Sequence, residues 1–259
     1  MLEVSPLEFR FSLETEREAL RSFTVKNTGE EPLDVNLSVE PPLELKNSAY
    51  GMLAKWISLS ETSFELNPKE AKEITFSIVY PETLPAGGQY ATIYAETSPS
   101  LEKSSSIKLI SRAGIKLYGS SSIEPYRNVN FSKPSIPTIL IKSHPSTNVS
   151  VKNSGNIDFS VVSTFSVSSL FGKQLYFDTL STELYPETSK ELFQEWAKSP
   201  SIGLYRVSYS TQALDTSIKS ETLVLIFSPF FLILFFLTIL TIVIAYLARH
   251  LTAKPSHLL

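Results

Sequence analysis

Few residues in this 259-residue chain could do chemistry. The chain has no cysteine, which excludes disulfides, zinc–thiolate sites and a cysteine nucleophile. Two of its three histidines, His250 and His257, lie in the last residues, so only His144 could serve in a Ser-His-Asp arrangement. His144 lies in LysSerHisProSerThr, which is typical of a loop, and a solvated histidine is the simpler interpretation. We therefore expect no catalytic residue.

Metal and phosphate sites are not expected either. The densest acidic stretch, residues 14–18, lacks the spaced Asp/Asn/Gly pattern of a calcium loop and is interpreted as a solvated turn. AlaGlyGlyGln (86–89) precedes a strand, and no helix follows it to hold a phosphate. The net charge of −3 gives no basic surplus for nucleic acid. The sequence thus predicts no metal, no cofactor, no nucleic-acid partner and no enzymatic activity.

The elements that position these residues are predicted to be strands. Apolar and polar residues alternate through most of residues 1–218, with Pro, Gly and Asn between the runs. Short strands with turn residues between them, and no convincing helical periodicity, predict an all-β sandwich architecture. The clearest period-two segments are 22–26, 33–39, 74–79 and 90–95.

The chain also repeats itself. Three signals recur in the same order, which predicts two tandem immunoglobulin-like β-sandwiches, at residues 1–120 and 121–220. The recurring pairs are 25–29 with 151–155, 64–76 with 182–193, and 85–94 with 200–209.

Each recurring signal has a predicted structural role. In the Lys-Asn-Thr/Ser-Gly turn, the glycine is expected to take a positive φ. Tyr90 and Tyr205, in the Gly-x-Tyr signals, are candidates for a tyrosine corner, in which the hydroxyl bonds nearby backbone, or for core packing. Trp56 and Trp196 do not align between the copies, and each is expected to pack in a core.

The last 37 residues predict a membrane anchor. Leu223 to Leu247 contains no charge, and as a helix its 25 residues would rise roughly 37 Å, against about 30 Å of bilayer hydrocarbon. We predict a transmembrane helix over residues 221–248 and a short tail over 249–259, with Pro229 near the helix start. The residues expected to anchor the chain in lipid are Leu223, Phe230, Phe231, Leu234, Phe235, Leu240, Ile244 and Leu247.

One segment breaks the strand pattern between Pro41 and Trp56. Its apolar residues Leu43, Leu45, Tyr50 and Met52 form either a loop folded onto the sandwich or an exposed partner contact. The folded loop is favoured because large exposed apolar patches are rare.

The chain resembles membrane-anchored tandem immunoglobulin-like envelope proteins of candidate-phylum bacteria, and its first copy is similar to WxL-protein-interacting surface proteins. The first copy carries the resemblance in PheThrValLysAsnThrGly, TrpIleSerLeuSer and AlaGlyGlyGlnTyrAla, and the second in LeuPheGlyLys, GluLeuPheGlnGluTrp and GlyLeuTyr. It implies sandwiches outside the cytoplasmic membrane, a cytoplasmic tail, and an adhesion, scaffold or binding role toward another surface protein or wall polymer.

Two other functions remain open. No signal peptide is visible at Met1, so the span could be a tail anchor with cytosol-facing sandwiches, as in proteins resembling major-sperm-protein-like contact adaptors. The basic residues near the span are balanced on its two sides and favour a cytoplasmic tail only weakly. A chaperone-like protein that complements partner strands shares the sandwich architecture. Neither the oligomeric state nor an open sheet edge can be predicted from the sequence.

Overall fold

The computed structural model describes residues 1–13, 20–98, 110–121, 123–141 and 143–252, so the acidic stretch 14–18 and most of the tail lie outside it. The described chain divides into two compact units. The first comprises Met1–Asn130, Lys152–Phe159 and Glu183–Ser189. The second comprises Phe131–Val151, Ser160–Thr182 and Lys190–Leu259.

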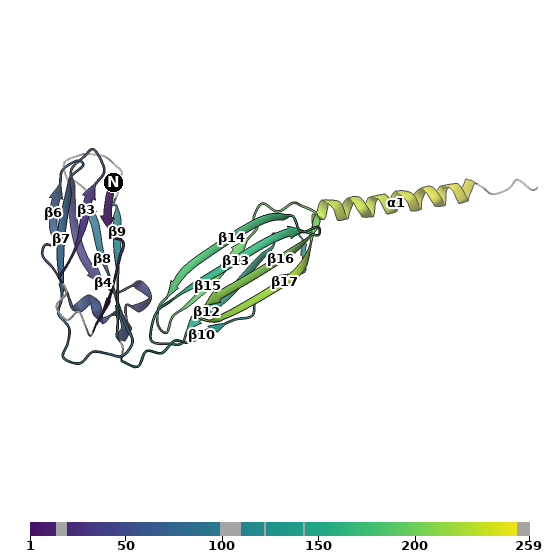
Figure 1. Ribbon diagram of the computed structural model, residues 1–259. Coiled ribbons are helices and arrows are strands. Elements are labelled where there is room, and N and C mark those ends of the chain that lie inside the picture. Colours follow the sequence, from purple (N-terminus) through teal and green to yellow (C-terminus); the bar gives the residue numbers. More distant parts are fainter. Residues whose placement is uncertain (14–19, 99–109, 122, 142, 253–259) are drawn as a thin grey trace, which may run out of the picture. The chain divides into compact units, whose positions relative to one another are not determined.

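Two sheets form the first sandwich (Figure 1). One has the strand order β1 (Leu2–Ser5), β3 (Arg21–Asn27), β7 (Ala71–Ile78), β5 (Ile57–Leu59). The other has the order β2 (Glu8–Ser12), β9 (Arg112–Ser120), β8 (Gly88–Ser98), β4 (Leu33–Glu40), β6 (Ser63–Leu66). The predicted segments 22–26, 33–39 and 90–95 lie in β3, β4 and β8, and 74–79 lies in β7 except for its last residue, Val79, which confirms the period-two signal.

Alternation along these strands builds the first core. Phe23 and Val25 on β3 point inward, as do Ile74 and Phe76 on β7, and all are at most 2 % exposed. Ile93 on β8 joins the same apolar cluster. Trp56 is partly buried against this cluster, as expected. The hydrophobic free energy of this interior is what orders the short strands, which are too short to be stable alone.

Two further sheets form the second sandwich. One has the order β10 (Val129–Phe131), β12 (Ser146–Asn153), β15 (Ser189–Glu195). The other has the order β11 (Ile139–Ile141), β17 (Thr216–Phe227), β16 (Gly203–Ala213), β13 (Phe159–Ser169), β14 (Gln174–Leu184). In each five-stranded sheet the first strand of the order pairs with its neighbour in parallel, β2 with β9 and β11 with β17. The shared strand order gives the sequence repeat a structural counterpart, so the chain is two tandem immunoglobulin-like sandwiches.

The recurring Lys-Asn turn is held by a buried asparagine. Asn27 and Asn153 are both 0 % exposed. Each side-chain oxygen accepts from the backbone N–H two residues later, at Gly29 and Gly155. Each Nδ2 donates to the carbonyl four residues later and to the carbonyl of a leucine that ends a strand, Leu66 or Leu184.

The expectation of a positive φ at the turn glycines is wrong. Positive φ among glycines occurs at Gly87, Gly172 and Gly203, within the described residues, and not at Gly29 or Gly155. A Cβ at Gly29 would meet the backbone nitrogen of Met1, and one at Gly155 would meet the carbonyl oxygen of Tyr126. Close approach of another backbone, instead of a left-handed conformation, therefore requires glycine here.

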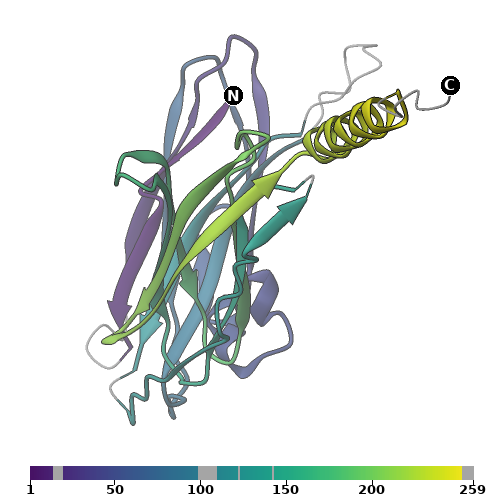
Figure 2. The same cartoon turned by 90° about the vertical axis from the view of Figure 1, so that its right-hand side faces the viewer.

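The helix α1 (Pro229–Thr252) follows β17 directly (Figure 2). Its Pro229–Arg249 segment has 21 residues and is long and apolar enough to cross a membrane. Such a segment rises roughly 31 Å, close to the thickness of a bilayer core. Seven of the predicted anchor residues lie exposed in α1: Phe230, Phe231, Leu234, Phe235, Leu240, Ile244 and Leu247.

The prediction that the helix includes Leu223 and begins near residue 221 is wrong. Leu223 lies in β17, paired with Arg206 on β16. Residues 223–227 alternate between core-facing and outward positions, which is a strand pattern that the uninterrupted apolar run concealed. Ser228 marks the change, since its Oγ accepts the N–H of Phe230 at 3.3 Å and Pro229 occupies the first helical position.

Candidate functional site

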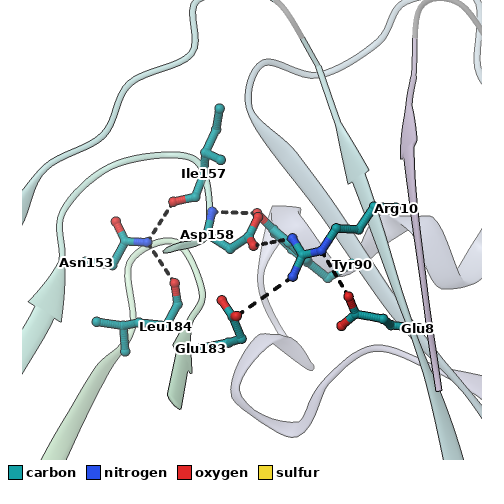
Figure 3. A network of polar contacts seen from close by, with 8 residues as sticks. All are labelled: Glu8, Arg10, Tyr90, Asn153, Ile157, Asp158, Glu183 and Leu184. Carbon is teal, nitrogen blue, oxygen red and sulfur yellow. Dashed lines mark hydrogen bonds and ion pairs between the residues drawn. The ribbon is translucent and has the colours of Figure 1, made fainter. Parts of the chain in front are cut away.

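A network of polar contacts within the first unit joins β2 and β8 to the segments 152–159 and 183–189 (Figure 3). Its centre is Asp158, whose carboxylate accepts from the Tyr90 hydroxyl at 2.8 Å and from Nη1 of Arg10 at 3.3 Å. The backbone N–H of Asp158 donates back to the Tyr90 hydroxyl at 2.8 Å. Arg10 also pairs with Glu8 at 3.3 Å and with Glu183 at 3.8 Å.

An aromatic cluster lies beside this network. Tyr90 is fully buried and contacts the rings of Tyr118 and Tyr185, with ring centroids 5.9 and 4.9 Å away. The guanidinium carbon of Arg10 lies 4.1 Å from the centre of the Tyr118 ring. Burial raises the pKa of Tyr90, and the charge of Asp158 raises it further. Burial also raises the pKa of Tyr185, with Tyr118 adding to the effect.

The hydrogen bonds and ion pairs of this network all join groups of the same chain. The Asp158 carboxylate is shared between two donors, and the tyrosines are held in their neutral form far above neutral pH. These bonds and ring contacts tie the segments 152–159 and 183–189 to β2 and β8 within the first unit.

The two Gly-x-Tyr tyrosines behave differently. Tyr205 donates its hydroxyl to the carbonyl of Ile202 at 3.2 Å, three residues earlier, which confirms the expected bond to nearby backbone. Tyr90 bonds Asp158 instead, which corrects the tyrosine-corner prediction for this residue. The physical reason is the strand face: β8 sends Ala91 and Ile93 into its sandwich core, so Tyr90 points to the outer side.

The segment between Pro41 and Trp56 forms two 3₁₀ helices, η1 (Leu43–Leu45) and η2 (Ala49–Lys55). Leu45 is 1 % exposed and packs against Tyr90, so its side chain supports the fold and cannot form an exposed contact. Tyr50 is partly buried against the same cluster. Leu43 is 82 % exposed and Met52 is 36 % exposed, and these two remain candidates for partner contact.

His144 lies at the end of the second unit where β17 meets α1. Its Nδ1 is 2.8 Å from Oγ of Ser199, and both side chains are exposed. They line a shallow pocket of about 280 Å³ with Ser143, Ser201 and Ser228. The pair has the first two members of a Ser-His-Asp arrangement, but the pocket is lined by no carboxylate in the part of the chain that the structure describes. No cluster of His, Asp and Glu suited to a metal ion occurs among the described residues either.

The feature best suited to a partner is the edge strand β14. It lies at one end of the order β11-β17-β16-β13-β14, so its only strand neighbour among those described is β13. It is 11 residues long, whereas the other edge strands have at most 7. Leu175 and Phe177 are 40 % and 56 % exposed, and Thr179 and Ser181 continue this outward row.

A buried chain of polar groups fixes this edge to the second core. Gln194 on β15 donates to Asp178 of β14 at 2.9 Å and accepts from Ser163 at 2.6 Å. The chain continues through Thr211 to the hydroxyl of Tyr209. Trp196 is 8 % exposed and stacks with Tyr176 of β14, which fits the core role predicted for it. A strand held in this way keeps its register and presents the same backbone groups to a partner.

Comparison with known proteins leaves the family open. No protein-family model matches the chain, and no curated protein matches it. Solved chaperone structures overlap it at low identity. A chain of the Salmonella enterica SafA pilin–SafB chaperone complex has a TM-score of 0.47 and 12 % identity, covering 87 % of this chain and 96 % of that one. The Escherichia coli chaperone DraB has a TM-score of 0.46 and 14 % identity, with 86 % and 96 % covered. At these values the likeness transfers no function.

Sequence reasoning missed both the network and the edge. Arg10, Asp158 and Glu183 lie far apart in the sequence, and no local pattern joins them. The edge had one readable signal: the segment from Gln174 to Ser181 contains no lysine, arginine or proline. Natural edge strands commonly carry such residues to prevent pairing, so their absence could have pointed to β14.

Proposed function

We propose that this protein is a non-enzymatic, membrane-anchored binding module that takes up an extended segment of another envelope protein along β14. In this mode the partner's backbone adds one strand to the sheet, and its alternate side chains pack beside the outward row. The observation that carries the proposal is the 11-residue edge strand with exposed Leu175 and Phe177.

The chemistry of the strand supports this proposal. From Gln174 to Ser181 the only charged residue is Asp178, and its carboxylate is engaged by Gln194. The neighbouring edge, β15, carries Lys190, Glu191 and Glu195, which disfavour strand addition there. A partner segment with apolar residues at every second position would cover Leu175 and Phe177 while its backbone satisfies the β14 edge.

The tether belongs to the same proposal. The Pro229–Arg249 segment would hold the sandwiches at a membrane, and the tail beyond it would be cytoplasmic, as the resemblance to envelope proteins implies. Tethering raises the local concentration of a binding module near other membrane-bound or surface partners. This strand-adding role is shared by adhesion scaffolds and by chaperones that complement partner strands.

Blocking the edge tests the proposal. Thr179→Lys with Ser181→Lys places two charges in the outward row of β14, where they oppose an incoming strand. The control is Ser166→Lys, on the same face of the interior strand β13, which pairs with a strand on each side. Affinity capture from solubilised native membranes should lose a partner with the edge variant and keep it with the control. Equal capture by both variants would contradict the proposal.

A further inference from the structure

The outer face of the large sheet in the second sandwich changes character along its length. Paired outward residues of β16 and β17 are polar far from α1: Gln212 with Ser217, Ser210 with Lys219, and Ser208 with Glu221. Toward α1 the pairs become Arg206 with Leu223, and then Leu204 with Leu225. The change occurs within one continuous, regularly paired ladder.

The parallel strand β11 widens the apolar end of this face. Ile139 pairs with Leu225, and Ile141 pairs with Phe227. Leu204, Leu225 and Ile139 thus form one row across three neighbouring strands. Ile139 is 61 % exposed, Ile141 55 % and Leu223 48 %. Their core-facing neighbours Leu140, Val224 and Ile226 are buried, so the second sandwich already has its interior, and the outward apolar row is additional.

A rigid hairpin tip lies at the same end. Ser169, the last residue of β13, pairs with Tyr205, so the turn that follows extends toward Gly203 and the α1 end of the sheet. The turn is closed by bonds between Ser169 and Lys173 and from the N–H of Gly172 to the carbonyl of Ser169. At its tip Phe171 is 98 % exposed and Leu170 is 47 % exposed. Exposure of a phenylalanine side chain to water on an ordered turn is energetically unfavourable in a sandwich that is surrounded by solvent alone.

We propose that this end of the second sandwich docks onto the bilayer itself, with Phe171 and the row Leu204, Leu225 and Ile139 entering the region between lipid headgroups and acyl chains. Here "docking face" means these four residues with Leu170, Ile141 and Leu223. The inference rests on the proposed membrane anchorage and adds a second lipid contact to it.

Chain connectivity identifies the bilayer as the occupant. Only Ser228 separates the end of β17 from α1. Residues 225–227 therefore lie within about 13 Å of Pro229 along the strand, and Leu223 lies about 20 Å from it, at about 3.3 Å per residue. Aromatic and aliphatic side chains at this height sit in the interfacial layer, where amphipathic elements bury their apolar side about 5–10 Å deep. The polar pairs farther along the sheet then mark the part that stays in water.

Single-cysteine labelling of the full chain in lipid vesicles tests this contact, because the chain has no native cysteine. Phe171→Cys carries an environment-sensitive fluorophore at the hairpin tip, and lipids with a quencher on the acyl chain report contact. The matched control is Asp215→Cys, in the exposed turn between β16 and β17 at the opposite end of the sheet. A third label at Leu240→Cys, within α1, reports whether the helix is inserted.

The expected result is strong quenching at positions 171 and 240 and none at 215. Quenching at 240 without quenching at 171 overturns the docking proposal and leaves the anchor intact. Absence of quenching at 240 overturns the anchor and the docking together. If the unlabelled Phe171→Cys variant instead forms a disulfide-linked dimer while its labelled form is not quenched, the face is a self-association surface and the proposal fails.

Discussion

The two copies of the sandwich use the same turn and different tyrosines. Asn27 and Asn153 are both fully buried. The side chain of each donates to the carbonyl four residues later and to the carbonyl of Leu66 or Leu184. Tyr90 and Tyr205 share a Gly-x-Tyr signal, but Tyr90 lies outside its core and bonds Asp158, whereas Tyr205 bonds its own turn. The buried asparagine bonding is thus the same in both copies, whereas the two tyrosines lie on opposite faces of their sheets.

The largest expected effect tests the shared turn. Asn27→Ala and Asn153→Ala each remove bonds to several buried backbone groups, and each should lower the free energy of unfolding by about 2–4 kcal/mol. Chemical denaturation in detergent, followed by fluorescence, measures this loss. Asn148→Ala, at an exposed position on β12, is the control and should have almost no effect. A large loss at only one of the two asparagines would break the equivalence of the turns.

Substitutions of the two tyrosines should change the free energy of unfolding by different amounts, unlike substitutions of the two asparagines. Tyr90→Phe leaves the Asp158 carboxylate and N–H without a buried partner, and should cost about 1–3 kcal/mol. Tyr205→Phe removes one exposed bond to Ile202 and should cost about 0.5 kcal/mol or less. Hydrogen exchange of the segment 152–159 should rise in Tyr90→Phe and stay unchanged in Tyr205→Phe. Equal effects would mean that the outer-face network contributes nothing.

Alkaline pH gives a graded test of the same network. The native state raises the pKa of Tyr90 and Tyr185, so both favour the folded chain in their neutral form. Their contribution is complete below the unfolded pKa of about 10 and is lost as the pH rises above it, by up to about 1.4 kcal/mol per group for each pH unit. The denaturant midpoint of unfolding should therefore fall between pH about 8 and pH about 11. This fall should be smaller in a variant with both Tyr90→Phe and Tyr185→Phe than in the parent protein. An unchanged difference would contradict this role.

The smallest expected effect concerns an arginine on the surface of the second copy. Arg206 pairs with Glu221 at 3.3 Å, and both side chains are about half exposed, at 49 % and 59 %. Arg206→Ala should change stability by about 0.5 kcal/mol or less. Arg10→Ala removes a partner of the more buried Asp158 and should cost more, about 1 kcal/mol. Thermal unfolding of the two variants measures both losses of stability. A larger loss in Arg206→Ala than in Arg10→Ala would contradict this prediction.

Local pattern accounts for what the sequence predicted well. Alternation located β3, β4, β7 and β8, and the recurring Asn turn revealed the duplication. The same period-two rule explains the error at Leu223, because a strand with apolar residues on both faces reads like the start of an apolar helix. Only Ser228 and Pro229, as a cap and a first helical residue, mark the boundary.

Faces and edges were harder to predict. A shift of one residue between β8 and β16 moves a tyrosine from one side of a sheet to the other, and the shared Gly-x-Tyr signal does not reveal it. Whether β14 lies at an edge depends on the pairing of strands distant in sequence. The apolar outer row near α1 is likewise visible only once Ile139 is known to pair beside Leu225.

The central claim, that β14 receives a partner strand, is tested most directly by photo-crosslinking in native membranes. A photoreactive residue at Thr179 lies in the outward row of the edge strand, and one at Ser208 lies on the outer face of the interior strand β16. We expect a specific protein adduct from position 179, lost when Ser181→Lys is added, and no adduct from position 208. No adduct at 179, or the same adduct from both positions, would contradict it.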